Sequence, residues 1–151
     1  MRAAVAYFFF AAFLRAPPFR AAFFAGRFAL FSAISGDFDP INVDEAYART
    51  TPFGRRIAHG ILSMALLSTV SAMISRRARE RGSQGTSVSL GYDRILFLKP
   101  VFVGDTLTAR YTILELDPAT RRSRSKVEVF RDGGELAVVG EHVMKWLPPE
   151  R

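Results

Sequence analysis

The chain has 151 residues, of which 49% are hydrophobic and 23% are charged, and this suits one globular domain with a sizeable core. It contains no cysteine, which excludes disulfide bonds and a thiolate nucleophile, and its two histidines match no zinc-binding spacing. The net charge of +7 comes mainly from arginine. The arginines do not form the groove-reading helix that nucleic-acid binding requires, so we expect no nucleic-acid partner, although a small anionic ligand would suit them.

Residues 1–30 are rich in phenylalanine and alanine and contain no acidic residue. The apolar run from Ala3 to Leu14 is too short to cross a bilayer, so we expect no membrane span, and no signal-peptide cleavage site follows it. Residues 1–27 therefore remain an atypical apolar N-terminal segment with no assigned structure. We expect the folded domain to occupy residues 28–151, with the remnant of a short helix between Gly26 and Ser32.

A polar turn and a short helix come next. Residues Ser32 to Asn42 combine glycine, proline and acidic side chains, which predicts loop and turn. Val43 to Arg49 reads as a short helix, for which Asn42 is the candidate N-cap, with Glu45 three residues later as in a capping box. A loop with Pro52 and Gly54 then leads to the main helix.

The segment from Gly60 to Arg79 predicts a long helix. It is apolar nearly all round, apart from a few hydroxyl side chains, and such a helix is expected to be buried on most of its sides. In a domain of this length, we expect a sheet to bury the apolar surface of this helix. The hydroxyl side chains are Ser63, Ser68, Thr69, Ser71 and Ser75.

The pattern changes to the alternation of strands after Thr86. Leu107 to Ile113 alternates apolar and polar residues, Asp132-Gly133-Gly134 predicts a hairpin turn, and Leu136 to Trp146 predicts the last strand. Ser87 to Leu98 predicts a further strand with a bend near Gly91. One long helix followed by consecutive antiparallel strands indicates an α+β domain.

Two separated motifs resemble those of the MaoC-like dehydratases, the family that includes the (R)-specific enoyl-CoA hydratases. The first is a Ser-Gly-Asp turn followed by a His-Gly pair at the start of the long helix, and the second resembles the family's F-x-x-P-V-x-x-G-D-x-L segment. The resemblance covers about residues 28–147 and implies a hot-dog fold, in which a curved antiparallel sheet wraps a long central helix. The matching residues are Ser35, Gly36, Asp37, Asp39, Pro40, Asn42, His59 and Gly60, then Phe97, Pro100, Val101, Gly104, Asp105 and Leu107.

The resemblance implies a lyase that adds water across trans-2-enoyl thioesters to give (R)-3-hydroxyacyl thioesters, or catalyses the reverse dehydration. Asp37 takes the place of the acid–base carboxylate, and the backbone amide of Gly60 that of the oxyanion donor. Ser35, His59 and Ser63 are expected to line the substrate site. No cofactor is implied beyond the coenzyme A or acyl carrier protein that carries the acyl group, and a cytoplasmic homodimer is expected.

Asn42 stands where the family has its catalytic histidine. An amide can orient a water molecule but cannot accept and return its proton near neutral pH. The sequence leaves Asn42 as an N-cap or loop residue, or as a residue that positions water. His59 and His142 are each interpreted as mainly structural.

Two other functions remain as alternatives. One is a catalytically impaired acyl-CoA-binding protein or partner subunit with the same fold, because Asn42 replaces the expected histidine. The other is a hot-dog thioesterase, which the Ser35-Gly36-Asp37 turn disfavours. Turnover of an enoyl thioester, as opposed to binding alone, separates the lyase from the binding protein.

Overall fold

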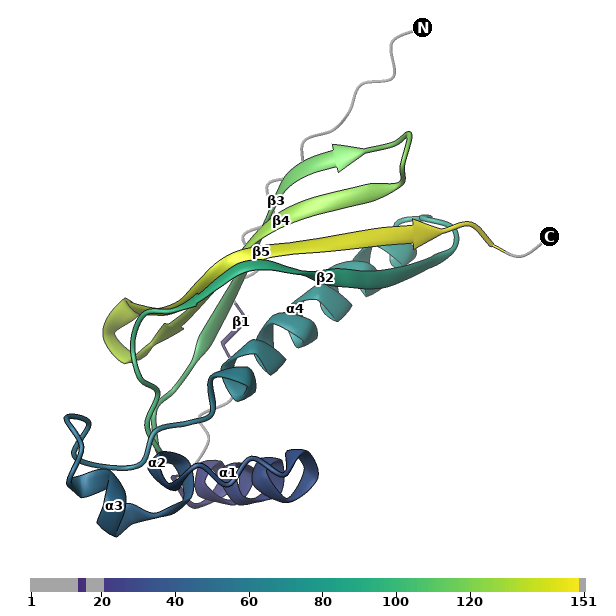
Figure 1. Cartoon of the computed structure of the whole chain (residues 1–151). Helices are drawn as coiled ribbons and strands as arrows, with labels where there is room; N and C mark the ends of the chain where they lie inside the picture. Colours follow the sequence, from purple (N-terminus) through teal and green to yellow (C-terminus); the bar gives the residue numbers. More distant parts are fainter. Residues whose placement is uncertain (1–13, 16–20, 150–151) are drawn as a thin grey trace, which may run out of the picture.

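The structure is a computed structural model that describes residues 14–15 and 21–149. Four helices and a short 3-10 turn combine with five strands, and the long helix α4 lies across one face of the sheet (Figure 1). The elements are β1 (Leu14–Arg15), α1 (Ala21–Ser35), α2 (Pro40–Val43), α3 (Glu45–Arg49), α4 (Gly60–Glu80), β2 (Thr86–Phe97), β3 (Thr108–Asp117), β4 (Arg122–Arg131), η1 (Asp132–Gly134) and β5 (Glu135–Leu147).

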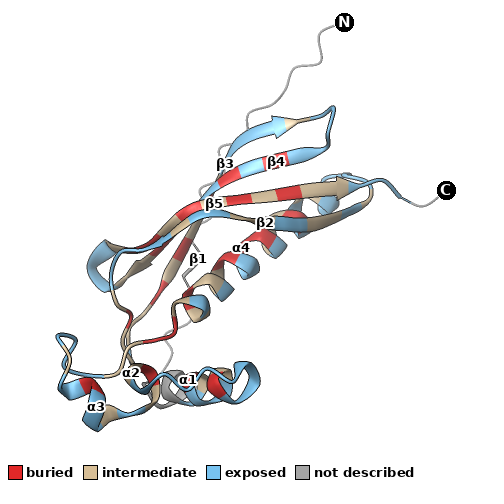
Figure 2. Ribbon diagram, viewed as in Figure 1, coloured by how far each residue is buried: buried red, intermediate tan, exposed pale blue. Residues whose placement is uncertain are grey.

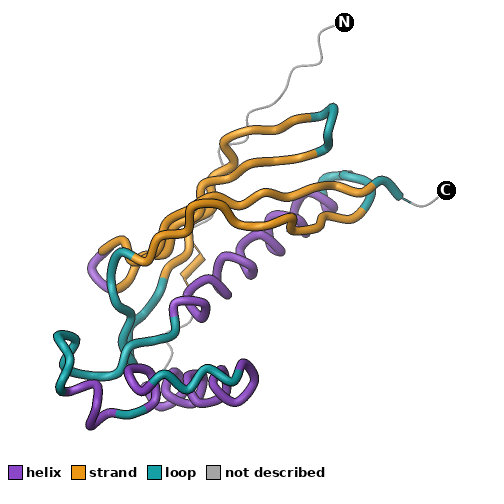
Figure 3. The backbone as a smooth tube through the Cα atoms, in the orientation of Figure 1, coloured by secondary structure: helices purple, strands orange, loops and turns teal. Residues whose placement is uncertain are grey.

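All pairings in the sheet are antiparallel, in the order β1-β3-β4-β5-β2. Tight turns join β3 to β4 and β4 to β5, whereas β2 reaches its place beside β5 from the end of α4 (Figure 3). Gly133 adopts a φ of 76° in the second of these turns, a conformation that glycine takes without strain. The predicted α+β class, the hairpin at residues 132–134 and the last strand are confirmed.

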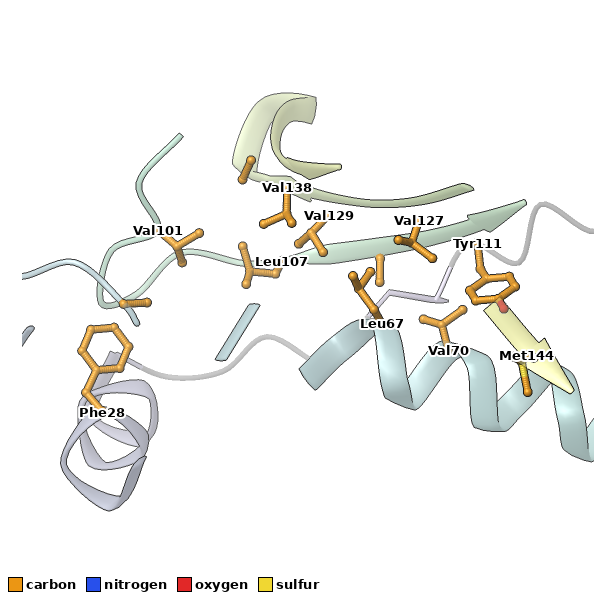
Figure 4. Close-up of a cluster of buried hydrophobic side chains, with 13 residues drawn as sticks. Phe28, Leu67, Val70, Val101, Leu107, Tyr111, Val127, Val129, Val138 and Met144 are labelled. Carbon is orange, nitrogen blue, oxygen red and sulfur yellow. The ribbon is translucent and has the colours of Figure 1, made fainter. Parts of the chain in front are cut away.

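The core lies between α4 and the sheet. Leu67 and Val70 of α4 point toward Val127, Val129 and Val138 of the sheet, and each of these five is at most 2% exposed (Figure 4). The alternation along β4 follows from the pleat, which directs every second side chain to the helix. Burial of these apolar side chains along the contact between α4 and the sheet, here called the seam, stabilises the packing of the two layers.

Two expectations about the helices are wrong. The helix α4 is buried along one face and not on most sides, and Ile61 is 49% exposed on the other (Figure 2). Its apolar residues exceed what a single sheet covers, and small side chains such as Ala65 and Ala72 lie exposed. The predicted helix over Val43 to Arg49 is broken at Asp44, which has an extended backbone and caps α3 with its own carboxylate.

The N-terminal region contains more regular structure than the sequence predicted. The helix α1 extends from Ala21 to Ser35, so the helical remnant expected over Gly26 to Ser32 is part of a longer helix that crosses the expected boundary at residue 28. Leu14 and Arg15 pair with β3. The rest of the apolar run that begins at Ala3 lies outside the described residues. No helix in the described ranges combines the length and apolar character needed to cross a bilayer.

His142 on β5 is fully buried in a polar cluster at one end of the core. Its Nδ1 lies 2.9 Å from the Tyr111 hydroxyl and its Nε2 lies 2.8 Å from the Ser89 hydroxyl, while the Tyr92 ring stacks on it at 4.3 Å. Burial lowers the pKa of His142 below its ordinary value of 6.5, and burial raises the pKa of Tyr111 to about 12. This geometry confirms the structural interpretation of His142.

The buried imidazole predicts loss of stability in acid. Because the pKa of His142 is lower in the folded than in the unfolded chain, its stabilising contribution is complete above about pH 6.5 and decreases as the pH falls toward the folded pKa. We expect His142→Gln, which keeps a donor and an acceptor for the two hydroxyls, to show a flatter dependence of Tm on pH between about 7 and 5 than the parent. Equal slopes for both proteins would contradict this assignment.

Candidate active site

The Ser-Gly-Asp turn is built by its own polar side chains. Ser35 Oγ donates to the Phe31 carbonyl at 2.7 Å and accepts from the Asp37 N–H at 3.2 Å. Asp37 Oδ1 then accepts from the Asp39 N–H, and Asp39 Oδ1 accepts from the Ile41 N–H. Such local bonds favour turns and helix starts over regular structure. Ser35 therefore shapes the turn, and its hydroxyl is used within α1 and the turn.

The turn brings Asp37 close to His59. The carboxylate Oδ2 of Asp37 lies 4.0 Å from Nε2 of His59, although the two residues are far apart in sequence. The Asp37 side chain is 52% exposed, whereas that of His59 is 2% exposed. An accessible carboxylate thus borders a buried imidazole.

The helix α1 holds the His59 ring from the other side. Phe31 lies over the ring at a centroid distance of 4.7 Å, Phe28 meets it edge-on at 6.3 Å, and the Ser32 hydroxyl is 3.4 Å from Nε2. Sequence reasoning missed these three residues. Their spacing along one helical face was the available signal, but it required α1 to be recognised.

The proton on His59 is assigned by its neighbour. Nε2 lies 3.3 Å from the backbone carbonyl oxygen of Asp37, which can only accept, and 3.4 Å from the Ser32 hydroxyl, so a bond to the carbonyl is made by the tautomer that has its proton on Nε2. Nδ1 is buried and has no hydrogen-bond partner among the described residues. The ring therefore presents its N–H to the turn that carries Asp37.

Asn42 is not an N-cap, which corrects one of the two interpretations of this residue. It lies inside α2, which is capped by Asp39, and α3 is capped by Asp44. The Asn42 side chain is buried, and its Nδ2 donates to the Ile57 carbonyl at 2.8 Å. It thus ties α2 to the strand-like segment that leads into His59.

Gly60 begins α4 directly after His59, which is the N-cap residue but makes no side-chain capping bond. The first N–H groups of a helix have no partner within the helix and carry its positive dipole end. A Cβ on Gly60 would lie 2.7 Å from the ring of Phe97. Glycine therefore lets the exposed Phe97 ring of β2 pack directly on the start of α4, and a larger residue would displace that ring.

The second motif supports the approach to α4. The Val101 carbonyl accepts from the Ala58 N–H at 2.7 Å, directly before His59, and Asp105 Oδ2 closes the following turn by accepting from the Phe102 N–H. These contacts confirm that the segment forms a kinked strand entry and a tight turn. The bond from Ala58 to Val101 therefore helps to position His59 and Gly60.

Ser63 lies one turn beyond Gly60 on the buried side of α4. No hydrogen bond joins it to Asp37 or His59 in the described part of the chain. The structure therefore brings together Asp37, His59 and the start of α4, with Asn42 behind them, and leaves Ser63 as a lining residue by position alone. The described residues include no group of three or more acidic or histidine side chains suited to a metal ion.

The arrangement suits proton transfer next to a developing anion. A carboxylate can act as a proton acceptor, and a neighbouring imidazole N–H can hold it in place. An uncapped helix N-terminus stabilises negative charge on an oxygen. The Asp37 carboxylate is open to solvent beside the buried His59 ring.

Comparison with known proteins agrees with this geometry. Residues 23–132 match the MaoC like domain. The chain is 38% identical over 123 residues to an (R)-specific enoyl-CoA hydratase of Aeromonas caviae, covering 82% of this chain and 86% of the relative. It is 35% identical over 115 residues to a 3-hydroxybutyryl-CoA dehydratase of Methylorubrum extorquens, covering 76% and 68%.

Solved structures give the same result. The (R)-hydratase of A. caviae superposes with a TM-score of 0.72 at 34% identity, covering 96% of this chain and all of that one. An R-hydratase of Pseudomonas aeruginosa superposes with a TM-score of 0.65 at 37% identity, covering 83% and 75%. The fold is that of the hot-dog hydratases, as the two motifs predicted, and the chain belongs to the MaoC-like domain family.

Proposed function

We propose that this protein hydrates trans-2-enoyl thioesters to (R)-3-hydroxyacyl thioesters or catalyses the reverse dehydration. The observation that carries the proposal is the Asp37 carboxylate 4.0 Å from the buried His59 imidazole, at the entrance to the uncapped start of α4. The names of the relatives support the reaction class, since they include hydratases and a dehydratase of acyl-CoA substrates.

Each step of the reaction has a residue suited to it. In hydration, Asp37 accepts a proton from water as the hydroxide adds to C3 of the enoyl group, and Asp37 then returns this proton to C2. Negative charge gathers on the thioester oxygen, where the Gly60 N–H at the start of α4 stabilises it. Dehydration runs through the same groups in reverse, so no redox change and no cofactor enter the balance.

His59 is the imidazole that supports Asp37 in this proposal. Asn42 cannot take the proton-transfer role of a histidine, and its Nδ2 is already bonded to the Ile57 carbonyl. His59 presents Nε2–H toward the Asp37 turn and orients the carboxylate. Proton transfer therefore rests on Asp37 alone, which makes a slow enzyme the expected outcome relative to one with two titratable groups.

The hydrogen bond from Asn42 to the Ile57 backbone carbonyl favours a second candidate function. A protein that binds acyl thioesters without turnover would keep the fold, the turn and the helix start, and would lack only the second proton-transfer group. Coenzyme A and acyl carrier protein are both suitable carriers. We expect a homodimer, because β2 forms an edge of the sheet that no other strand of the described residues covers.

The test follows loss of the conjugated thioester absorbance with crotonyl-CoA and a longer trans-2-enoyl-CoA. We expect slow but steady turnover by the parent, and a rise of about tenfold or more in Asn42→His, which restores a second group for proton transfer. Asn42→Gln has similar reach but does not titrate, so it should not exceed the parent.

The outcomes separate the candidates. Turnover that appears only in Asn42→His identifies the parent as a binding protein on an intact scaffold. Absence of turnover in all three proteins with both substrates would contradict the hydratase proposal.

A further inference from the structure

A basic pocket lies at the end of the molecule opposite the candidate active site. It has a volume of about 410 Å³ and lies between the β3–β4 turn and the end of β5. Its lining contains three cationic side chains and no acidic one: Ala119, Thr120, Arg121, Arg122, Lys145, Leu147 and Pro148. A concave site of this size accommodates a small molecule better than a macromolecular surface.

The backbone places these cations side by side. Arg122 and Lys145 are direct cross-strand partners in the antiparallel pair of β4 and β5. Arg121 adopts a left-handed backbone with a φ of 56°, and its carbonyl accepts from the Trp146 N–H at 2.9 Å. Like charges directly opposite on neighbouring strands destabilise a sheet, and an anion bound between the two side chains would relieve this repulsion.

The described residues neutralise little of this charge. No carboxylate among them forms an ion pair with Arg121, Arg122 or Lys145 within 4.0 Å. Asp117 is the register partner of Arg122, but its oxygens accept from the Ala119 and Thr120 N–H groups and from the Thr120 hydroxyl. The pocket therefore keeps an excess of positive charge.

More positive charge lies at the same end of the molecule. The helix α4 ends at Glu80, and β2 begins at Thr86 beside Leu147, which lines the pocket (Figure 1). Arg77 and Arg79 lie in the last turn of α4 and Arg81 is its C-cap residue, whereas Arg76 pairs with Glu80. Together these groups create a positive potential that attracts anions toward the pocket.

We propose that the pocket lined by Arg121, Arg122 and Lys145 binds a phosphate group of a small phosphorylated ligand. Guanidinium groups match the geometry of phosphate oxygens and bind them in pairs of parallel hydrogen bonds. Two arginines and a lysine, with no carboxylate in the pocket lining, supply several such donors in one site.

The ligand phosphate has two sources. One is a free phosphorylated metabolite. The other is the coenzyme part of a thioester bound at the active site of a second copy, a reading that rests on the proposed function. The edge strand β2 begins beside Leu147 and ends at Phe97, against Gly60. If two copies pair these edges antiparallel, the pocket end of each copy comes beside the active-site end of the other.

Trp146, the chain's one tryptophan, provides an intrinsic signal near the pocket, because its backbone lies between the lining residues Lys145 and Leu147 and its N–H donates to the Arg121 carbonyl, although its side chain points to the other face of β5. Its emission would be followed while the full-length protein is titrated with inorganic phosphate, adenosine 3′,5′-bisphosphate or coenzyme A. We expect saturable binding, weakened about tenfold in Arg122→Gln and in Lys145→Gln. Arg76→Gln removes the same charge at an exposed position outside the pocket and should change affinity little.

Comparison of the three titrants also identifies the source of the bound phosphate group. Tighter binding of coenzyme A than of the bisphosphate, with a raised KM for crotonyl-CoA and an unchanged kcat in Arg122→Gln, would indicate the coenzyme. In that case Arg122→Gln should leave the KM unchanged for the crotonyl thioester of N-acetylcysteamine, which lacks phosphate. Equal binding of all phosphates would indicate a free metabolite and holds even if the protein has no hydratase activity. Absence of saturable binding, or equal weakening in Arg76→Gln, would overturn the proposal.

Discussion

Replacement of Asp37 by asparagine is expected to lower turnover of crotonyl-CoA by about 10²–10⁴-fold. The asparagine side chain has the same shape and still accepts from the Asp39 N–H, so the turn should persist. It cannot accept a proton from water, and in the proposed mechanism no other group adjoining His59 does so. The measurement is kcat from loss of the conjugated thioester absorbance, with Tm recorded for the same samples.

Asp39→Asn is the matched control for this prediction. Asp39 is also exposed, lies two residues away and carries the same charge, but its carboxylate caps α2 by accepting from the Ile41 N–H. Asparagine is an equally good N-cap, so activity and Tm should both stay close to those of the parent. Comparable losses of kcat in the two variants would assign the effect to the turn's charge or shape, and would remove Asp37 from the chemistry.

Truncation of Leu67 to alanine should produce the largest loss of stability. Leu67 is fully buried at the centre of the seam between α4 and the sheet, among Val70, Val127 and Val129 (Figure 4). Loss of its side chain removes apolar burial and leaves a cavity, which together cost about 2–5 kcal/mol in the free energy of unfolding. Urea unfolding at one fixed protein concentration measures this cost.

The same truncation at an exposed leucine provides the control. Leu30 on α1 is 59% exposed, and alanine is a strong helix former, so Leu30→Ala should change the free energy of unfolding by less than about 1 kcal/mol. A large loss at Leu30 would mean that this face of α1 is covered in the assembled protein. A small loss at Leu67 would show that α4 does not depend on this seam.

Elements with a regular pattern were predictable from the sequence. The long helix was expected from Gly60 to Arg79 and is found from Gly60 to Glu80, and the last strand was expected within one or two residues of its observed bounds. The bend near Gly91 appears as a register shift between Ser89 and Gly91. Periodicity of this kind depends on local geometry, which neighbouring residues determine.

The short and irregular segments were less predictable. The helix α1 was only partly recognised because its sequence is apolar on every side. Hydrophobic periodicity therefore did not indicate the residue at which the helix begins. The break at Asp44 was missed because capping competes with helix continuation, and Asp39 and Asp44 both prefer to cap. Such choices depend on a few hydrogen bonds rather than on a repeated pattern.

The sequence by itself determined the family, the reaction class proposed for it and the positions of Asp37, Asn42, His59 and Gly60, because these residues stand in motifs of fixed spacing. Only the tertiary structure decided where they lie relative to one another. It placed the Asp37 carboxylate beside His59, committed Asn42 to the Ile57 carbonyl, and set Arg122 opposite Lys145. The physical reason is that these contacts join segments far apart in the chain, whose meeting depends on how α1, α4 and the sheet pack.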